Sequence, residues 1–273
     1  MSDLYGSDAY SPVEIARRIE SVGEAKARMA FWPLALLGVL AGAFIGLGAM
    51  LFVLVKSDAS LGFATSAFLG GLVFSMGLLM VVVAGAELFT GNNLIVMAWA
   101  DGRIGARLVL RNWAVVCLAN GVGAAGLAVL VFTSGHADLH GGAVGQQVVK
   151  IALAKQDLPF GTALVRGVLC NILVCMAVWM AMAGRTVVDK AAAVMLPVMA
   201  FVAAGFEHSI ANMYLMPLAM LLQHSASSLA ALPPVTWAGF LGNLFPVILG
   251  NVLGGAFLVA GVYHVIYRRT PKG

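Results

Sequence analysis

The sequence predicts an all-α polytopic membrane protein with six transmembrane helices. Of its 273 residues, 61% are hydrophobic and only 10% are charged, and long apolar runs recur along the chain. Soluble domains carry about 25% charged residues, so the composition excludes an ordinary soluble protein. The net charge of +4 is not gathered in a basic cluster with interleaved aromatic residues, which argues against nucleic-acid binding.

The first expected element is an amphipathic helix over 11–29. Ser11 and Glu14 form a capping-box pattern at its start. An apolar stripe from Ile15 to Met29 is flanked by basic side chains. This pattern predicts a helix that lies on the cytoplasmic surface of the membrane.

Six apolar runs follow, and each is long enough to cross a bilayer, which takes about 20 helical residues. Two of them are far longer than this, so we expect each of these two to hold a helix interrupted at mid-membrane. The runs cover 31–55, 61–99, 108–133, 159–183, 188–222 and 237–267, the second and fifth being the overlong ones. The chain thus divides into an N-terminal segment, 1–29, and a transmembrane domain, 30–273.

The distribution of lysine and arginine predicts that both termini are cytoplasmic, because short cytoplasmic loops are enriched in these residues. With this orientation most of the 16 basic residues lie inside. The four that lie outside are Lys56, Lys150, Lys155 and Arg166.

The two overlong runs share a short motif. AGAELFTGN at 84–92 and AGFEHSIAN at 204–212 both read A-G-x-E-x4-N. The run after each motif carries two asparagines in the same relative positions, Asn112 with Asn120 and Asn243 with Asn251. The chain is therefore predicted to contain three spans that are repeated once.

An odd number of spans in each repeat forces the halves, about 30–133 and 159–267, into opposite orientations, which makes an inverted repeat. Gly85, Gly91 and Gly205 tolerate non-helical dihedral angles in the motifs. Irregular backbone at membrane depth persists only where protein buries it or where it lines a cavity. We therefore expect helices two and five to be broken and to meet near the midplane.

The polar residues at the expected breaks are the candidates for function. Glu87 and Glu207 are the acidic residues in the interior of the apolar runs, and they occupy the same repeat position. Intramembrane ionisable groups are costly and default to functional hypotheses. A purely structural role stays open, in which the carboxylates cap backbone amides freed by the breaks.

His208 has no counterpart in the first half, where Leu88 stands. Histidine exchanges protons near physiological pH, so we interpret His208 as a pore-lining, titrating residue. Thr90 lies in the opposite break and can bond His208 or a substrate. Half-helix N-termini favour an anion, whereas a bare anion is strongly disfavoured in an apolar constriction. These residues together suggest proton-coupled passage of a small weak acid.

Four longer blocks resemble the formate/nitrite transporter family, over essentially the whole chain. They are AELFTGN, NILVCMAVWMAMAGR, LPVMAFVAAGFEHSIANMYLMP and NLFPVILGNVLGG. The resemblance, greatest to the formate channels, implies an aquaporin-like protomer with its own pore. It also implies a homopentamer in a prokaryotic cytoplasmic membrane, in contact with lipid and without cofactor or enzymatic activity. The implied substrates are formate and protons, with nitrite or hydrosulfide as alternatives.

The resemblance also implies specific site residues. His208 matches the central histidine of the family and Thr90 its opposing threonine. The residues matching the two constrictions are Phe74 with Phe201, and Leu78 with Leu88. The residues matching the polar surroundings of the chamber and its vestibule are Glu207, Asn212, Lys155, Asn171 and Asn251.

Two other classes of protein fit the sequence less well. A water or glycerol channel fits an aquaporin-like layout, but the sequence has no N-P-A triplet. A metal site at HADLH (136–140) would have two histidines and Asp138 in a glycine-rich loop, with no further ligand nearby in the sequence. We therefore predict no metal site.

Overall fold

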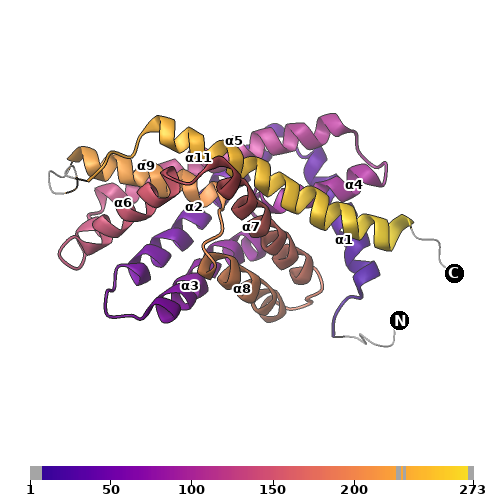
Figure 1. Ribbon diagram of the computed structural model, residues 1–273. Coiled ribbons are helices and arrows are strands. Elements are labelled where there is room, and N and C mark those ends of the chain that lie inside the picture. Colours follow the sequence, from indigo (N-terminus) through magenta and orange to yellow (C-terminus); the bar gives the residue numbers. More distant parts are fainter. Residues whose placement is uncertain (1–7, 226–228, 230–231, 270–273) are drawn as a thin grey trace.

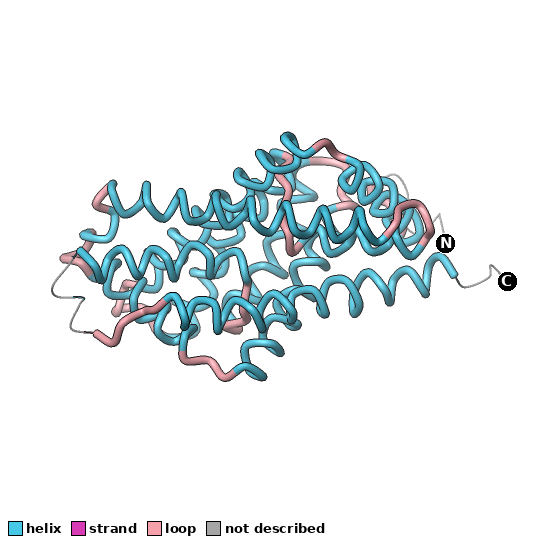
Figure 2. Tube along the Cα trace, turned by 90° about the horizontal axis from the view of Figure 1, so that it is seen from above, coloured by secondary structure: helices cyan, strands magenta, loops and turns pink. Residues whose placement is uncertain are grey.

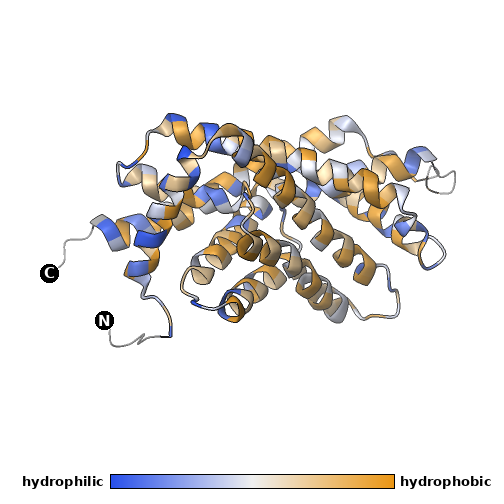
Figure 3. Ribbon diagram, turned by 180° about the vertical axis from the view of Figure 1, so that it is seen from behind, coloured by the Kyte–Doolittle hydropathy of each residue, from blue (hydrophilic) through white to orange (hydrophobic). Residues whose placement is uncertain are grey.

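The computed structural model describes residues 8–225, 229 and 232–269 of the chain. Its regular structure is helical, apart from one antiparallel bridge between Ala9 and Gly184. Both described ends of the chain lie at the same end of the molecule (Figures 1 and 2). Hydrophobic residues dominate the helices of the bundle, and hydrophilic residues gather near that end and in the loops (Figure 3).

The helices fall into two series of the same order. The first comprises α1 (Pro12–Arg28), α2 (Phe31–Lys56), α3 (Phe63–Ala84), η2 (Gly91–Ile95), α4 (Val96–Ala100) and α5 (Ala106–Thr133). The second comprises α6 (Ala143–Gln156), α7 (Phe160–Ala181), α8 (Val187–Ala203), α9 (Ser209–Ser225) and α11 (Trp237–Val252). A short turn, η3 (His136–Asp138), joins the two series, and α11 continues as η4 (Leu253–Gly261), α12 (Val262–His264) and η5 (Val265–Arg269).

Within the described residues, five helices are long and apolar enough to cross a membrane. They are Phe31–Lys56, Phe63–Ala84, Ala106–Thr133, Phe160–Ala181 and Trp237–Arg268. The fifth apolar run forms α8 and α9, which have 17 residues each because the chain leaves the helix between them. A sixth crossing would therefore have to combine α8 with α9.

Helix α1 begins as the sequence predicts, with Ser11 as N-cap and Glu14 completing the capping box. Its apolar face is not free to enter lipid, however. Ile15 and Ile19 are buried in a hydrophobic cluster with Leu94 and Ile95 of η2. The expected lipid contact of this face is replaced by packing against the protein, because the segment after the first break presents a complementary apolar surface.

A buried carboxylate fastens α1 to the end of the chain. Glu20 is 0% exposed and pairs with Arg103 at 3.0 Å and with Arg268 at 2.8 Å. Burial is the main cause that raises the pKa of the Glu20 carboxyl, and the neighbouring arginines oppose this shift. Helix α1 is therefore held both by apolar packing and by ion pairs.

The two helix breaks have the same backbone geometry. Gly85 follows α3 with φ of +86° and Gly205 follows α8 with φ of +69°, a region that favours glycine. Gly91 needs no such freedom, since it begins η2 with φ outside this region. After each glycine the chain runs alongside a neighbouring helix, as the Glu87 and Glu207 amides each donate to a carbonyl there, at 3.2 Å.

One asparagine braces each break. The Asn120 amide donates to the carbonyls of Gly38 and Glu87 at 2.7 and 2.9 Å, and its oxygen accepts from the backbone N–H of Phe89. Asn251 repeats this pattern with the carbonyls of Gly167 and Glu207 at 2.9 and 3.0 Å, and with the N–H of Ser209. Both asparagines are 0% exposed. Backbone groups that the breaks free from helical bonding are thus paired inside the protein.

Replacing Asn251 by Ala is expected to lower the free energy of unfolding by about 3 kcal/mol, because it leaves the buried Glu207 carbonyl and Ser209 amide without this partner. Asn251→Asp should be similarly harmful, since a carboxylate would then face two carbonyl oxygens. The measurement is thermal or denaturant unfolding in detergent. Gln146→Ala, at an exposed position of α6, is the control, and equal midpoints for Gln146→Ala and Asn251→Ala would contradict this account.

Close contact between α2 and α5 depends on glycine. A Cβ atom added at Gly123 would lie 1.9 Å from the carbonyl oxygen of Val39, whereas one at Gly126, on the same helix, would meet no atom within 4 Å. Gly123→Ala should therefore force the helices apart and destabilise the protein by about 1–3 kcal/mol. Gly126→Ala should be neutral or stabilise by up to about 1 kcal/mol. Comparing the two unfolding midpoints checks the prediction, which fails if Gly123→Ala is the milder change.

Candidate functional site

Two cavities lie beside the breaks. The α1-side cavity, of about 180 Å³, is lined by residues of α1, α3 and the first break, including Lys26, Leu78, Glu87 and Leu88. The α6-side cavity, of about 210 Å³, is lined by residues of α3, α6, α7, α8 and the second break. Its lining includes Phe74, Lys155, Phe201, Glu207 and His208.

Of the residues expected at the two constrictions, one pair lines each cavity. Leu78 and Leu88 line the α1-side cavity, and both are 2% exposed. Phe74 and Phe201 line the α6-side cavity, with ring centroids 5.7 Å apart in an edge-to-face arrangement. The wall of each cavity therefore includes one of the expected apolar pairs.

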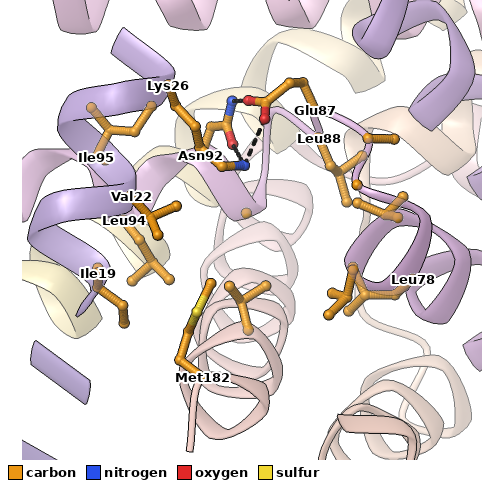
Figure 4. Close-up of a pocket in the computed structure, with 17 residues that line it drawn as sticks. Ile19, Val22, Lys26, Leu78, Glu87, Leu88, Asn92, Leu94, Ile95 and Met182 are labelled. Carbon is orange, nitrogen blue, oxygen red and sulfur yellow. Dashed lines mark hydrogen bonds and ion pairs between the residues drawn. The ribbon is translucent and has the colours of Figure 1, made fainter. Parts of the chain in front are cut away.

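Lys26 forms the polar end of the α1-side cavity (Figure 4). Its Nζ lies 2.9 Å from Glu87 Oε1 and donates to Asn92 Oδ1 at 3.0 Å. Asn92 in turn donates to Glu87 Oε2 at 2.7 Å and to Asn112 Oδ1 at 3.0 Å. The Asn112 amide donates to the carbonyl of Lys26 at 3.2 Å, which closes the network on α1.

Lys155 forms the equivalent network on the other side. Its Nζ donates to both carboxylate oxygens of Glu207, at 2.9 and 3.0 Å. Asn212 donates to Glu207 Oε2 and to Asn243 Oδ1, both at 2.7 Å, and Asn243 donates to the carbonyl of Lys155 at 3.0 Å. The lysine, glutamate and two asparagines thus repeat on the two sides.

This correspondence extends the repeat by one helix beyond the three spans that the sequence suggested. It pairs α1 with α6, because these helices carry Lys26 and Lys155. The sequence reasoning missed Lys26. The spacing from Lys26 to Lys155 equals the spacing between the two G-V-L triplets at 38–40 and 167–169, and this signal could have found it.

The glutamates do not cap backbone amides, which was one interpretation of the sequence. Their carboxylates bond lysine and asparagine side chains instead. The backbone of each break is satisfied by Asn120 and Asn251, which come from helices later in the chain. A motif read locally could not show this, since both partners lie more than thirty residues away.

His208 and Thr90 meet between the two breaks. The imidazole Nε2 lies 3.0 Å from the Thr90 hydroxyl oxygen, and the two residues are 3% and 0% exposed. The Ala211 amide donates to His208 Nδ1 at 3.2 Å. Nδ1 therefore accepts, so in the neutral ring Nε2 carries the hydrogen and donates it to Thr90. The hydroxyl hydrogen of Thr90 is then free to donate to a third group.

Side chains pair with two of the first amides of α9, which the sequence suggested as donors for an anion. Asn251 accepts from the Ser209 amide and His208 accepts from the Ala211 amide. The side-chain donors that meet between the breaks are His208 Nε2 and the Thr90 hydroxyl. The His208 ring also stacks on Phe201, with centroids 5.9 Å apart.

Asn171 of α7 bonds to backbone carbonyls next to the site. Its amide donates to the Thr90 carbonyl at 3.2 Å and to the Asn251 carbonyl at 2.6 Å. Cys175, one turn further along α7, donates to the same Thr90 carbonyl at 3.4 Å. Asn171, Asn212 and Asn251 line neither cavity, so they position the groups around the centre rather than form its walls.

The HADLH loop does not gather as a metal centre. Among the described residues, the one group of three acidic or histidine side chains close enough for a metal ion is Glu20, Asp101 and His264. The carboxylates of Glu20 and Asp101 are already paired with Arg103 and Arg268. The group is therefore an ion-pair cluster of α1 with the end of the chain.

Comparisons with known proteins identify the family of this chain. Residues 13–265 match the family described as formate/nitrite transporter. The formate channel FocA of Haemophilus influenzae is 37% identical over 276 residues, which covers 97% of this chain and 96% of that protein. FocA of Escherichia coli K12 is 37% identical over 273 residues, covering 96% of each.

A solved structure described as a pentameric formate channel with formate bound has a TM-score of 0.82 with this chain. It shares 36% sequence identity and covers 87% of this chain and 98% of its own. The family match extends over nearly all of the sequence, and it includes both breaks and both lysine–glutamate pairs. The chain belongs to the formate/nitrite transporter family.

Proposed function

We propose that this protein is a membrane channel for small monovalent weak-acid anions, with formate as its principal substrate. The observation that carries the proposal is the buried His208–Thr90 pair, which joins the two breaks beside cavities whose walls include the expected apolar pairs. The name of the solved neighbour, a pentameric formate channel with formate bound, supports formate and a homopentamer.

The membrane placement follows from the same elements. Six crossings, with α8 and α9 forming one broken crossing, place α1 and the end of the chain on one face. The excess of lysine and arginine assigns that face to the cytoplasm of a prokaryotic cell. The α1-side cavity then opens inward and the α6-side cavity opens outward.

The apolar pairs explain why a proton accompanies the anion. Moving a bare anion past Phe74 and Phe201, or past Leu78 and Leu88, removes its hydration without replacing it. The neutral acid avoids most of this penalty. Lys26 attracts the anion to one cavity and Lys155 to the other. Movement past the apolar pairs then favours the protonated, neutral form of the substrate.

His208 and Thr90 act on the substrate where the path from the α1-side cavity meets the path from the α6-side cavity. With His208 Nε2 donating to its oxygen, the Thr90 hydroxyl can donate its own hydrogen to an oxygen of the substrate. The imidazole is also the group there whose ordinary pKa lies near physiological pH, so we assign it the exchange of a proton with the substrate. In this exchange the ring takes up a proton at Nδ1, in place of the bond from the Ala211 amide, and Nε2 gives its hydrogen to the substrate.

The first test is flux into proteoliposomes under inward gradients of formate, nitrite, hydrosulfide or glycerol, at pH 7 and pH 5. Formate flux should be the largest and should rise at pH 5, because a larger fraction of the substrate is then protonated. Empty liposomes correct for simple diffusion of the neutral acids. Passage of glycerol without any of the anions would refute the proposal, and a larger nitrite flux would change the principal substrate.

The hydroxyl of Thr90 should matter more than its shape. Thr90→Val keeps the side-chain volume but removes the hydroxyl, and we expect it to lower formate flux about tenfold, the effect of losing roughly 1.4 kcal/mol at the barrier. Thr90→Ser keeps the hydroxyl and should retain most of the flux. Unfolding midpoints of both variants show whether the fold is intact, and equal fluxes for Val and Ser would contradict a role for the hydroxyl.

A further inference from the structure

The two cavities differ in charge although their surroundings repeat. The ionisable lining of the α1-side cavity is one lysine and one glutamate, Lys26 and Glu87. The lining of the α6-side cavity has the equivalent pair, Lys155 and Glu207, together with Arg166 and the buried His208. With His208 neutral, the α6-side cavity therefore carries one additional positive charge.

The guanidinium of Arg166 is not committed to another residue. Glu207 is already paired, since it accepts two bonds from Lys155 and one from Asn212. In the described part of the chain, no hydrogen bond or ion pair joins the Arg166 side chain to a partner, and the residue is exposed. A cation that lines a cavity without a counter-charge is available to an incoming anion.

The fold does not require an arginine at this place. The backbone carbonyl of Arg166 accepts from the Glu207 amide at 3.2 Å, and the carbonyl of Leu37 accepts from the Glu87 amide at the same distance in the other half. Leucine therefore performs the backbone role in one repeat and arginine in the other. The guanidinium is an addition to the repeat rather than part of its scaffold.

We propose that Arg166 is the specificity-determining residue of the α6-side cavity, where it captures planar anions with two oxygen atoms. The inference rests on the proposed function and names the substrate class that this mouth favours. A guanidinium presents parallel N–H groups that match two oxygens of one anion. Carboxylates such as formate, and nitrite, satisfy this geometry, whereas hydrosulfide offers a single acceptor atom.

The test compares three variants by flux into proteoliposomes over a range of anion concentrations. Arg166→Leu installs the residue found in the other repeat. It should raise the formate concentration for half-maximal flux about 3- to 10-fold at low ionic strength, with the maximal flux unchanged. The increase should shrink in high salt, because salt screens the attraction. Lys150→Leu removes an exposed charge from α6 outside the cavity lining and should behave as the wild type.

Arg166→Lys separates charge from geometry. At low salt, the formate concentration for half-maximal flux should be that of the wild type, because lysine keeps the positive charge. The variant should also lower the preference for formate over hydrosulfide, because an ammonium group does not offer the planar pair of donors. A preference equal to that of the wild type would overturn the two-oxygen recognition, and equal results for Arg166→Leu and Lys150→Leu would overturn the capture itself.

The outcomes also distinguish this inference from the proposed function. If the wild type transports formate and Arg166→Leu has the same half-maximal formate concentration, the proposed channel function is supported and the role of Arg166 is refuted. If the wild type carries nitrite instead of formate, the same variants are compared with nitrite against hydrosulfide. A wild type that carries none of these anions would refute both.

Discussion

The pairing of freed backbone groups at the two breaks is the constraint on which the site depends. Where the chain leaves the helix at Gly85 and Gly205, unpaired amides and carbonyls would cost several kcal/mol in a water-free interior. Asn120 and Asn251 satisfy them from helices that cross beside the breaks. Because these bonds fix the backbone, the side chains of the break segments are held in place at the centre of the molecule.

The lysine–glutamate pairs follow from the same constraint. A carboxylate inside an apolar bundle needs a counter-charge and further hydrogen bonds to be tolerated. Glu87 and Glu207 each obtain a lysine and an asparagine amide, and the lysine comes from α1 or α6, outside the apolar runs. The outer helices of each repeat thus supply positive charge to the cavities.

The sequence predicted the parts of this structure that depend on local pattern. The capping box at Ser11 and the left-handed glycines at 85 and 205 follow from residues that are close together in the chain. The partners of Glu87, and the packing of the α1 apolar face on η2, could not be predicted in this way. They depend on which helices are neighbours in space, and Lys26 is separated from Glu87 by the whole of α2 and α3. The resemblance to a family identified Lys155 but not its counterpart.

The places where the two halves differ are the places where chemistry can arise. A repeat that shares its breaks, its asparagines and its lysine–glutamate pairs provides a scaffold that treats both sides alike. Leu88 in one half corresponds to His208 in the other, so only one break carries a titratable ring. Leu37 corresponds to Arg166, so only one cavity has an uncommitted cation. Symmetry at the level of the backbone thus keeps the breaks stable, and in the proposed channel the departures from it at these positions give the route a centre and a direction of approach.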